Sequence, residues 1–540
     1  MSKNPSHPLL RRTSPVQKMY QRYFEYYFHH AAPSLSGTLD HSFWGVYVLQ
    51  LCRSEPAIWD GLISLSALFE RPPVNNASNP TALLNSPVEV RHEYHHDALA
   101  WYSRSLAGLR RRISGGGRVV DVDVVLVGTI IYIAIEFLQA NYKAVMGLYT
   151  RGMQLIAGNV AAESGLEVAV KAMFRRLRTQ ILIFSSVPMS EDIPDHPALN
   201  ERFESIDSAR NTLFELISDM KQLLLAIKSY RAQTGSTHIP SSHQLTAKQA
   251  ELEQQLHNWY NAFTTLSPPP KTGVRDPTTL ILLMNHTAIL LETRICLSAS
   301  ESAYDSQNNE FEKILKYAYS LSSWPSSPPS ASTHRKRQPF SFDLSTFLPL
   351  FITALKCRDP ALRRKALCLL SGGDSSTTTG AAVVTAVQGL FLSRPAAQLI
   401  AIIVGLEERS DLFLPASASV TTTPLNPGQE TDEVPSLENI VKSILSQNGC
   451  IPKDEHRICD FWISSSSEAA PPELLYLSAQ GKRRIDAVKN SKGGEVWLYY
   501  RRFTCLEAPV SYDGHAEEGG RKMGYVTRRI RLKISDFNVT

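Results

Sequence analysis

The most specific chemical signal in the sequence is the run HEYHH, in which His92, Glu93 and His96 match the pattern H-E-x-x-H. On a helix this spacing places two histidines on one face as zinc ligands, with the glutamate between them as the general base of a hydrolase. Such a site needs an apolar, buried helix, whereas Arg91 and Asp97 flank this run. We therefore predict histidines on the exposed first turns of a helix. A zinc metallohydrolase is kept as the weaker alternative.

A second group of potential metal ligands lies near the C-terminus, where Cys450, His456 and Cys459 follow one another. Their spacing matches no common zinc module, and a fourth ligand is missing. The chain has seven cysteines and no C-x-x-C pair, and such scattered thiols are typical of a reducing compartment. We interpret the cysteines as buried thiols and predict no metal site, no cofactor and no catalytic residue, so the protein is not expected to be an enzyme.

One basic run has the composition of a nuclear import signal. Arg335, Lys336 and Arg337 follow His334 inside a segment rich in serine and proline, where an import receptor could read their charges. The run from Lys482 to Arg484 is a second candidate. The alternative for both is ordinary solvated surface. A formal net charge of +5 is too small to predict non-specific binding to nucleic acid.

Nothing in the sequence predicts a secretory leader or a membrane span. No apolar run follows Arg11 and Arg12. The longest apolar stretch, Val124 to Ile135, is shorter than the roughly 20 residues that a helix needs to cross a bilayer. We expect a soluble intracellular protein.

Helical periodicity dominates roughly the first four hundred residues of the chain. Ile58, Leu62, Leu65 and Phe69 recur at spacings of four, three and four, which predicts one buried helix face after Ser54 as a cap and a proline in the first turn. The same pattern predicts three further helices, with buried faces at Ala98, Tyr102, Leu106 and Leu109, at Tyr142, Val145, Tyr149, Gly152 and Ile156, and at Phe311, Leu315, Ala318 and Leu321.

Another helix is predicted to open at Asp359 and Pro360. Its apolar positions, Leu362, Ala366 and Leu369, should face inward. The three basic residues between them should face water, and these are Arg363, Arg364 and Lys365.

The pattern changes to strand spacing near the C-terminus. Residues 525–534 alternate apolar side chains with Arg529, Arg531 and Lys533, and residues 495–503 form a second probable strand. The basic face is interpreted as a solvated edge that discourages aggregation, with a nucleic-acid surface as the alternative.

These patterns predict an all-α fold, an irregular stack of antiparallel helix pairs with a small C-terminal appendage that contains β-strands. We divide the chain into a disordered N-terminus, a helical domain, a linker and a C-terminal segment with short strands, at residues 1–19, 20–412, 413–436 and 437–540. Helix-breaking residues predict loops inside the helical domain near 71–90, 264–277, 324–340 and 371–380.

The segment from Phe24 to Glu70 carries a series of landmarks in order: APSLSG, then Asp40 with the pair Phe43 and Trp44, then VLQ, SEPAI and a helix that ends in AL-x-E. This segment resembles the opening of the fungal-specific transcription factor domain. Further motifs in the family's order extend the resemblance to about residue 410. None of the shared motifs is catalytic. The resemblance implies a helical regulatory and interaction domain, control of secondary-metabolite or nutrient genes, and a location in the nucleus, with the cytoplasm as a second location.

Members of this family usually carry, before the domain, a six-cysteine cluster that binds two zinc ions and places a helix in the major groove. This sequence has no C-x-x-C pair, and it departs from the family after Leu370, where SGGDSSTTTG intervenes. We therefore expect no direct sequence-specific binding to DNA. The expected partners are other transcription regulators or DNA-bound proteins, with a homodimer or heterodimer left open. A helical scaffold without a role in transcription is the alternative.

Overall fold

The computed structural model describes residues 15–37, 40–71, 93–114, 122–139, 141–158, 165–184, 202–232, 241–269, 275–298, 300–322, 346–371, 387–388, 391–408, 444, 449–464, 495–505 and 523–533. The chain forms two compact units. Unit 1 comprises residues 1–75 and 87–170, and unit 2 comprises residues 76–86 and 171–540. None of the described helices is long and apolar enough to span a membrane. The predicted domain boundaries stay predictions.

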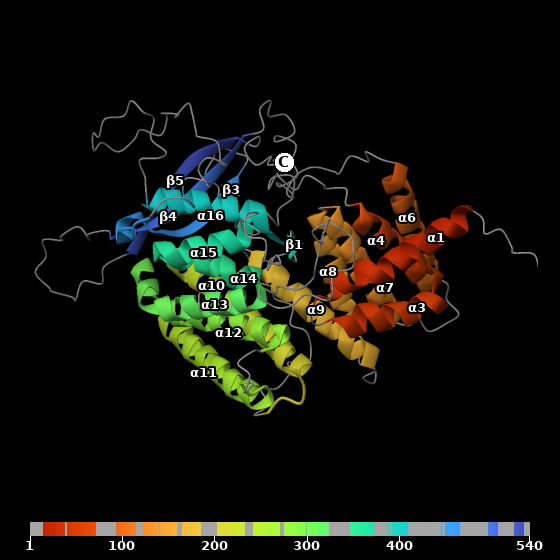
Figure 1. Cartoon of the computed structure of the whole chain (residues 1–540), viewed down its shortest axis with the longest axis horizontal. Coiled ribbons are helices and arrows are strands. Elements are labelled where there is room, and N and C mark those ends of the chain that lie inside the picture. The colour runs from red at the N-terminus through yellow and green to blue at the C-terminus, as the bar shows by residue number, and fades with distance from the viewer. Residues whose placement is uncertain are drawn as a thin grey trace, which may run out of the picture. The chain divides into compact units, whose positions relative to one another are not determined.

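The described residues of unit 1 form a series of helices (Figure 1). They are α1 (Pro15–Tyr26), η1 (Tyr27–Ala31), α2 (Ala32–Ser36), η2 (Phe43–Tyr47), α3 (Val48–Ser54), α4 (Pro56–Glu70), α6 (Glu93–Ser114), α7 (Val122–Leu138) and α8 (Tyr142–Gly158). Helix α7 is buried from Val124 to Leu138, and it packs against both α4 and α8. The apolar stretch at 124–135 is therefore part of a buried core helix. This agrees with its length, which is below the roughly 20 residues that a membrane span needs. Helix α9 (Gly165–Phe184) continues from unit 1 into unit 2.

The predicted helix at 56–70 is confirmed as α4, and the four residues of its predicted face are buried. Ser54 does not cap this helix. Glu55 occupies the N-cap position without a side-chain hydrogen bond, while Ser54 Oγ donates to Leu51 O within the last turn of α3. Because Pro56 is the first helical residue, Ser54 lies one position before the N-cap, and α4 begins without a serine cap.

Helix α6 confirms the predicted periodicity, with one position wrong. Ala98, Tyr102 and Leu109 are buried, but Leu106 is 38% exposed. The buried position on that turn is Ser105, whose Oγ donates to Ala57 O and lies 2.8 Å from the Tyr132 hydroxyl. Helix α4 comes too close at this turn for a leucine, and a serine occupies the inward position instead.

The described part of unit 2 starts within α9, at residue 171, and continues as a series of helices (Figure 1). They are α10 (Ile206–Ala232), α11 (Ser242–Leu266), α12 (Pro277–Ile295), η3 (Glu301–Gln307), α13 (Asn308–Ser322), α14 (Phe347–Lys356), α15 (Pro360–Ser371) and α16 (Ser393–Glu408). Consecutive helices pack against each other, as in the pairs α10 with α11, α12 with α13 and α14 with α15. This arrangement agrees with the predicted stack of helix pairs.

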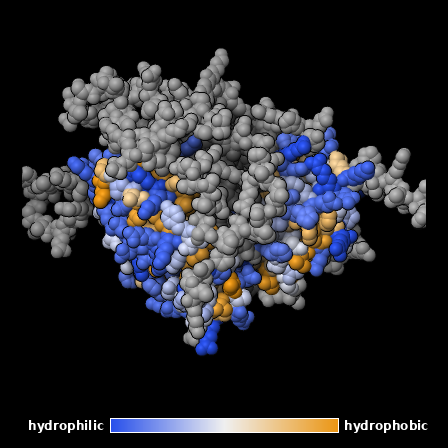
Figure 2. Space-filling model, viewed as in Figure 1, coloured by the Kyte–Doolittle hydropathy of each residue, from blue (hydrophilic) through white to orange (hydrophobic). Residues whose placement is uncertain are grey.

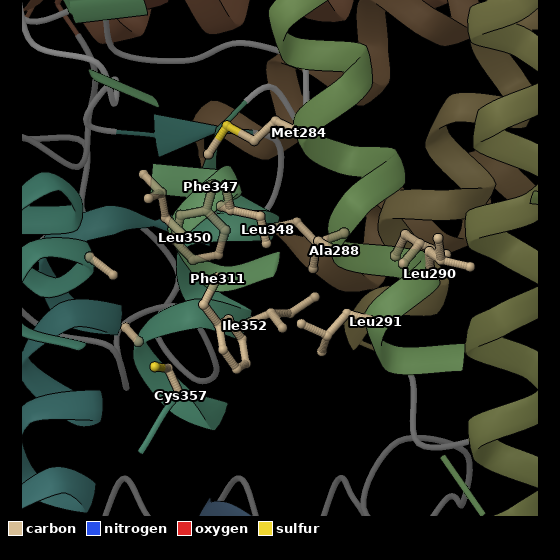
Figure 3. Packing of buried hydrophobic residues seen from close by; sticks show 14 of the residues in the cluster. Met284, Ala288, Leu290, Leu291, Phe311, Phe347, Leu348, Leu350, Ile352 and Cys357 are labelled. Carbon is tan, nitrogen blue, oxygen red and sulfur yellow. The ribbon is translucent and has the colours of Figure 1, made fainter. Parts of the chain in front are cut away.

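The core of unit 2 lies between these helix pairs. Phe347, Leu350 and Ile352 of α14 belong to one hydrophobic cluster with Leu291 of α12 and Phe311 of α13 (Figure 3). All five are buried. Burial of such side chains contributes roughly 1.5–3 kcal/mol each, so this cluster is a main source of stability for unit 2.

Helix α15 begins as predicted, because Asp359 Oδ1 accepts hydrogen bonds from the N–H groups of Ala361 and Leu362, both at 2.9 Å. The prediction that its basic residues face water is wrong for two of the three. Lys365 is exposed, but the side chain of Arg363 is fully buried and that of Arg364 is 14% exposed. The following helix α16 ends in two glutamates, and these carboxylates pair with both arginines.

The β-structure of the described chain is small and lies in unit 2. Strands β1 (Val387–Gln388) and β2 (Phe391–Leu392) form one antiparallel pair. After η5 (Asp454–His456), strands β3 (Ile458–Ser464), β4 (Glu495–Cys505) and β5 (Met523–Lys533) form an antiparallel sheet in that order. Strands β4 and β5 confirm the two predicted strands. The fold is thus all-α with the small β-containing appendage that the sequence predicts.

Candidate functional site

The H-E-x-x-H run lies at the start of α6, and its described residues are not arranged as zinc ligands. His92 lies outside the described residues, and Glu93 is the first residue of the helix. His96 is exposed, as predicted for the first turns. The buried histidine of this run is His95, whose Nε2 lies 3.0 Å from Arg71 O. Since a backbone carbonyl only accepts, Nε2 carries the proton and ties the start of α6 to the end of α4.

In the part of the chain that the structure describes, no group of three or more His, Cys, Asp or Glu side chains could hold a metal ion. Cys450, His456 and Cys459, the second set of potential ligands, do not form such a group either. Cys450 is exposed, and its Sγ lies 3.5 Å from Glu408 O. The prediction that the cysteines are buried is wrong for Cys450. It is confirmed for Cys52, Cys296 and Cys357, where burial raises the pKa of the thiols to about 11, 12 and 12.

The landmarks of the sequence resemblance build the core of unit 1. Asp40 O accepts from the backbone N–H of Trp44, and the rings of Phe43 and Trp44 meet edge to face with centroids 5.0 Å apart. Both rings are buried. The Tyr27 hydroxyl donates to Trp44 O at 2.9 Å, which fixes this turn against η1. These residues shape a helix turn.

Small hydroxyl side chains join the helices of unit 1 to each other. Ser64 Oγ donates to Ala98 O at 2.8 Å, and Ser66 Oγ donates to Tyr23 O at 2.6 Å. Both serines are on α4 and both are fully buried. A buried hydroxyl that donates to a backbone carbonyl satisfies its own hydrogen-bonding capacity and lets two helices approach closely. These serines are therefore packing residues and not nucleophiles.

The buried acid of unit 1 is Glu136, on α7. Its Oε1 accepts from the Tyr102 hydroxyl at 2.7 Å, and its Oε2 accepts from Asn141 Nδ2 at 2.8 Å. Burial raises the pKa of Tyr102, and the Glu136 carboxylate raises it further. A tyrosine held in its neutral form and a carboxylate with both oxygens occupied do not make an acid–base pair for catalysis. They connect α6, α7 and the start of α8.

A group of buried, ion-paired side chains lies in unit 2, between α14, α15 and α16. Glu407 pairs with Arg358 at 3.0 Å and with Arg363 at 2.6 Å, and the three side chains are at most 1% exposed. Burial raises the pKa of Glu407, but the two guanidinium groups more than offset that effect and hold the pKa below its ordinary value. Burial lowers the pKa of Arg363, although Glu407 opposes the change. The cluster is an internally compensated ion network.

This network also holds the C-terminal segment. Glu407 Oε1 accepts from the Ile458 backbone N–H at 2.7 Å, and Arg502 Nη2 donates to Leu406 O at 2.9 Å. Arg457 donates to both oxygens of Asp305 at 2.8 Å. Sequence reasoning missed these contacts. The one available signal was the acidic pair that ends the otherwise apolar helix at 393–408.

The proposed nuclear import signal, Arg335 to Arg337, lies outside the described residues, as does the second candidate at 482–484. The basic residues of β5 can be placed by register alone. Arg529 pairs with Tyr499, and Arg531 pairs with Trp497. The choice between a solvated edge and a nucleic-acid surface therefore stays open.

Hydrophilic residues cover most of the coloured surface in Figure 2, with hydrophobic residues in small groups between them. In unit 1 the exposed large hydrophobic residues are Phe28, Val46, Leu106, Ile113, Met146, Leu155 and Val168. Single exposed apolar side chains are normal for a folded domain, and they do not by themselves mark a binding site.

One comparison with known proteins gives a match. Residues 22–163 match the family described as the fungal specific transcription factor domain. No curated protein and no solved structure matches the chain. The matched range begins within α1 and extends past the end of α8, and it contains the Phe43 and Trp44 turn and the serine-joined helices. Over residues 22–163 the chain is therefore similar to the fungal specific transcription factor domain.

Proposed function

We propose that this protein regulates transcription through protein contacts made by its helical domain. The observation that carries the proposal is the family match over residues 22–163, in which the described landmarks form helix packing and hydrogen bonds between helices. A domain whose distinctive residues maintain a helical scaffold is suited to binding other proteins, since its surface is free to vary while the scaffold stays fixed.

The expected partners are other transcription regulators or proteins already bound to DNA, and the controlled genes are those of secondary metabolism or nutrient use. The absence of a C-x-x-C pair in the sequence supports indirect action, because a six-cysteine zinc cluster requires clustered thiolates. In this proposal the protein works in the nucleus and adds no sequence-specific DNA contact of its own.

A tethering experiment tests the regulatory role. The full chain is fused to a heterologous DNA-binding domain and directed to a reporter promoter in a fungal host, and we expect reporter expression to change at least severalfold. Trp44→Ala removes a fully buried ring from the core of unit 1 and should abolish the effect. Lys365→Gln, an exposed position of unit 2, is the matched control. An unchanged reporter with a well-expressed fusion would count against the proposal.

Proximity labelling in the native host tests the partners. The labelled set should contain transcription regulators or chromatin proteins. Recovery of cytosolic proteins alone, together with unchanged transcripts after deletion of the gene, would favour a scaffold without a role in transcription.

Nuclear entry is tested at Arg335, Lys336 and Arg337. We expect a fluorescent fusion with all three changed to alanine to lose nuclear enrichment, since an import receptor reads their positive charges. The same change at Lys482, Arg483 and Arg484 tests the second candidate, and Lys365→Gln, at an exposed position, is the control for loss of charge. Normal nuclear entry of the first variant would refute the assignment.

Direct DNA binding is tested by a gel shift with the purified full chain on promoter fragments. We expect weak complexes that salt dissolves, because electrostatic contacts to phosphates fall steeply with ionic strength. Tight, sequence-specific complexes that persist at 200 mM salt, a concentration at which phosphate contacts alone become weak, would overturn this part of the proposal.

A further inference from the structure

A surface corner of unit 2 joins two serines to an acid that is distant in sequence. Ser300 Oγ lies 2.8 Å from Asp454 Oδ1 and 2.7 Å from Asp454 Oδ2. Ser302 Oγ lies 2.6 Å from the same Ser300 oxygen. The three oxygen-bearing groups therefore form one connected hydrogen-bonded set, in which Ser300 is the link between Ser302 and the carboxylate.

This corner is one of several attachments that hold the segment 449–464 on the helices. The others include the double hydrogen bond from Arg457 to Asp305, the Ile458 N–H to Glu407, and Lys356 Nζ to Cys459 O at 3.4 Å. Most of these attachments are polar, and together they determine whether β3 stays on the helical unit.

Ser302 has the properties of a protein kinase substrate. It is exposed, and it lies in the short 3-10 helix η3, whose hydrogen-bond geometry is weak enough to open locally. Glu301 precedes it and Asp305 follows three positions later. Acidic residues at such positions match the charge pattern that acidophilic serine kinases read with a basic groove.

We propose that Ser302 is a phosphorylation site and that a phosphoryl group there releases the segment 449–464 from the helices of unit 2. In the modification step the Ser302 hydroxyl oxygen attacks the γ-phosphorus of ATP held by an acidophilic serine/threonine kinase. The Oγ–P bond forms, the bond from that phosphorus to the bridging oxygen breaks, ADP leaves, and the hydroxyl proton passes to the kinase's carboxylate base.

The direction of the effect follows from the charges around the corner. A phosphoserine carries close to two negative charges at pH 7. Asp454 is joined to Ser302 through a single serine oxygen, and Asp305 lies on the same short helix. The neighbouring cation, Arg457, already donates to both oxygens of Asp305. Added negative charge therefore repels Asp454 and breaks the attachment at Ser300, while Arg457 is shared between Asp305 and the phosphate on the same short helix.

The experiment uses the full chain treated with a purified acidophilic serine/threonine kinase and MgATP. Mass spectrometry locates the phosphate, and hydrogen–deuterium exchange follows the Ile458 amide, which donates to Glu407. We expect stoichiometric modification of Ser302 and about a tenfold faster exchange at Ile458, the scale set by a partly screened charge pair at short range.

Three variants make the test specific. Ser302→Ala should abolish the modification and keep slow exchange, whereas Ser306→Ala, an exposed serine on the same helix, should leave both unchanged from the wild-type chain. Asp454→Asn removes the repelled charge and should reduce the tenfold acceleration to less than threefold. No phosphate on Ser302 would overturn the site. Unchanged or slower exchange after modification, which would mean that the phosphate recruits Arg457 and tightens the corner, would overturn the release.

Discussion

Arg363 Nη2 lies 2.6 Å from Glu407 Oε2, and neither side chain has any exposed surface. Arg358 approaches the other oxygen of the same glutamate at 3.0 Å. A carboxylate with no access to water depends on these two cations to stay ionised, and it is the partner that the two buried guanidinium groups share. The packing of α14, α15 and α16 thus rests on a charge balance as well as on apolar contacts.

Glu407→Gln should destabilise unit 2 strongly, because it keeps the shape of the side chain but removes the buried carboxylate that both guanidinium groups share. Among the described carboxylates, Arg358 then keeps only Glu301, at 3.2 Å, and Arg363 keeps only Glu408, at 3.9 Å. We expect a loss of about 3–5 kcal/mol in the free energy of unfolding. Urea denaturation followed by circular dichroism measures it. Lys365→Gln also removes one charge from this region, but at an exposed position, and should change stability by less than about 0.5 kcal/mol. Equal effects of the two variants would contradict the role of burial.

Two helical glycines should respond in opposite ways to alanine. A Cβ at Gly61 would lie 3.0 Å from Ser105 Oγ and 3.4 Å from Ile131 Cγ2, where α4 meets its neighbours. Gly61→Ala should therefore destabilise unit 1 by roughly 1–3 kcal/mol. A Cβ at Gly147 would meet nothing within 4 Å, so Gly147→Ala should stabilise α8 by about 0.5–1 kcal/mol. Thermal melting of both variants checks the opposite signs.

His286 predicts a loss of stability in acid. Its ring stacks between Trp259 and Tyr260, with centroids 5.1 and 5.3 Å away, and its Nε2 lies 2.9 Å from Leu256 O. Burial lowers the pKa of this imidazole to about 4, whereas the unfolded chain binds the proton near its ordinary value of 6.5. The unfolded state therefore holds more protons between pH 6.5 and 4. The contribution of His286 is complete above pH 6.5 and is lost as the pH falls through that range.

The size of this effect at His286 is about 3 kcal/mol, from a shift of more than two units. Comparing urea unfolding at pH 7 and pH 4.5 measures it. His286→Gln keeps a hydrogen-bond donor without the titration and should show a smaller difference between the two pH values. His257→Gln, at a half-exposed histidine on α11, should behave like the wild-type chain. A pH dependence that survives His286→Gln unchanged would assign it to other groups.

Local periodicity predicted the helices, because a buried stripe leaves its spacing in the sequence. The face of Ile58, Leu62 and Leu65 is an example. Local periodicity could not predict that Ser105, and not Leu106, is the inward residue of α6, because that choice depends on how closely α4 approaches α6. Turn chemistry likewise predicted the start of α15 at Asp359. The same sequence pattern placed Arg363 at the surface, because its carboxylate partners lie on another helix.

The candidate site shows the same limit of local sequence patterns. The run at His92, Glu93 and His96 fits a motif in sequence, yet the buried histidine of that run is His95, and its partner is a carbonyl of α4. The contact between Ser300 and Asp454 joins residues on either side of the predicted linker. Pairings of this kind carry no periodicity or motif, so they become visible only when the chain is folded.

The cysteines give a prediction that depends on exposure and on pKa together. Thiolates react with iodoacetamide, and burial raises the pKa of Cys52 to about 11 and of Cys357 to about 12. At pH 8 each buried thiol is therefore ionised in roughly one molecule in a thousand or fewer. Cys450 is exposed and should be alkylated first. Peptide mapping after a short treatment of the native chain should find the label on Cys450 and not on Cys52 or Cys357.

Two controls accompany this labelling experiment. Cys450→Ser should remove that label, and full denaturation in urea should make the buried thiols react. Rapid labelling of Cys357 in the native chain would mean that α14 and α15 separate readily, contrary to the buried charge balance between them.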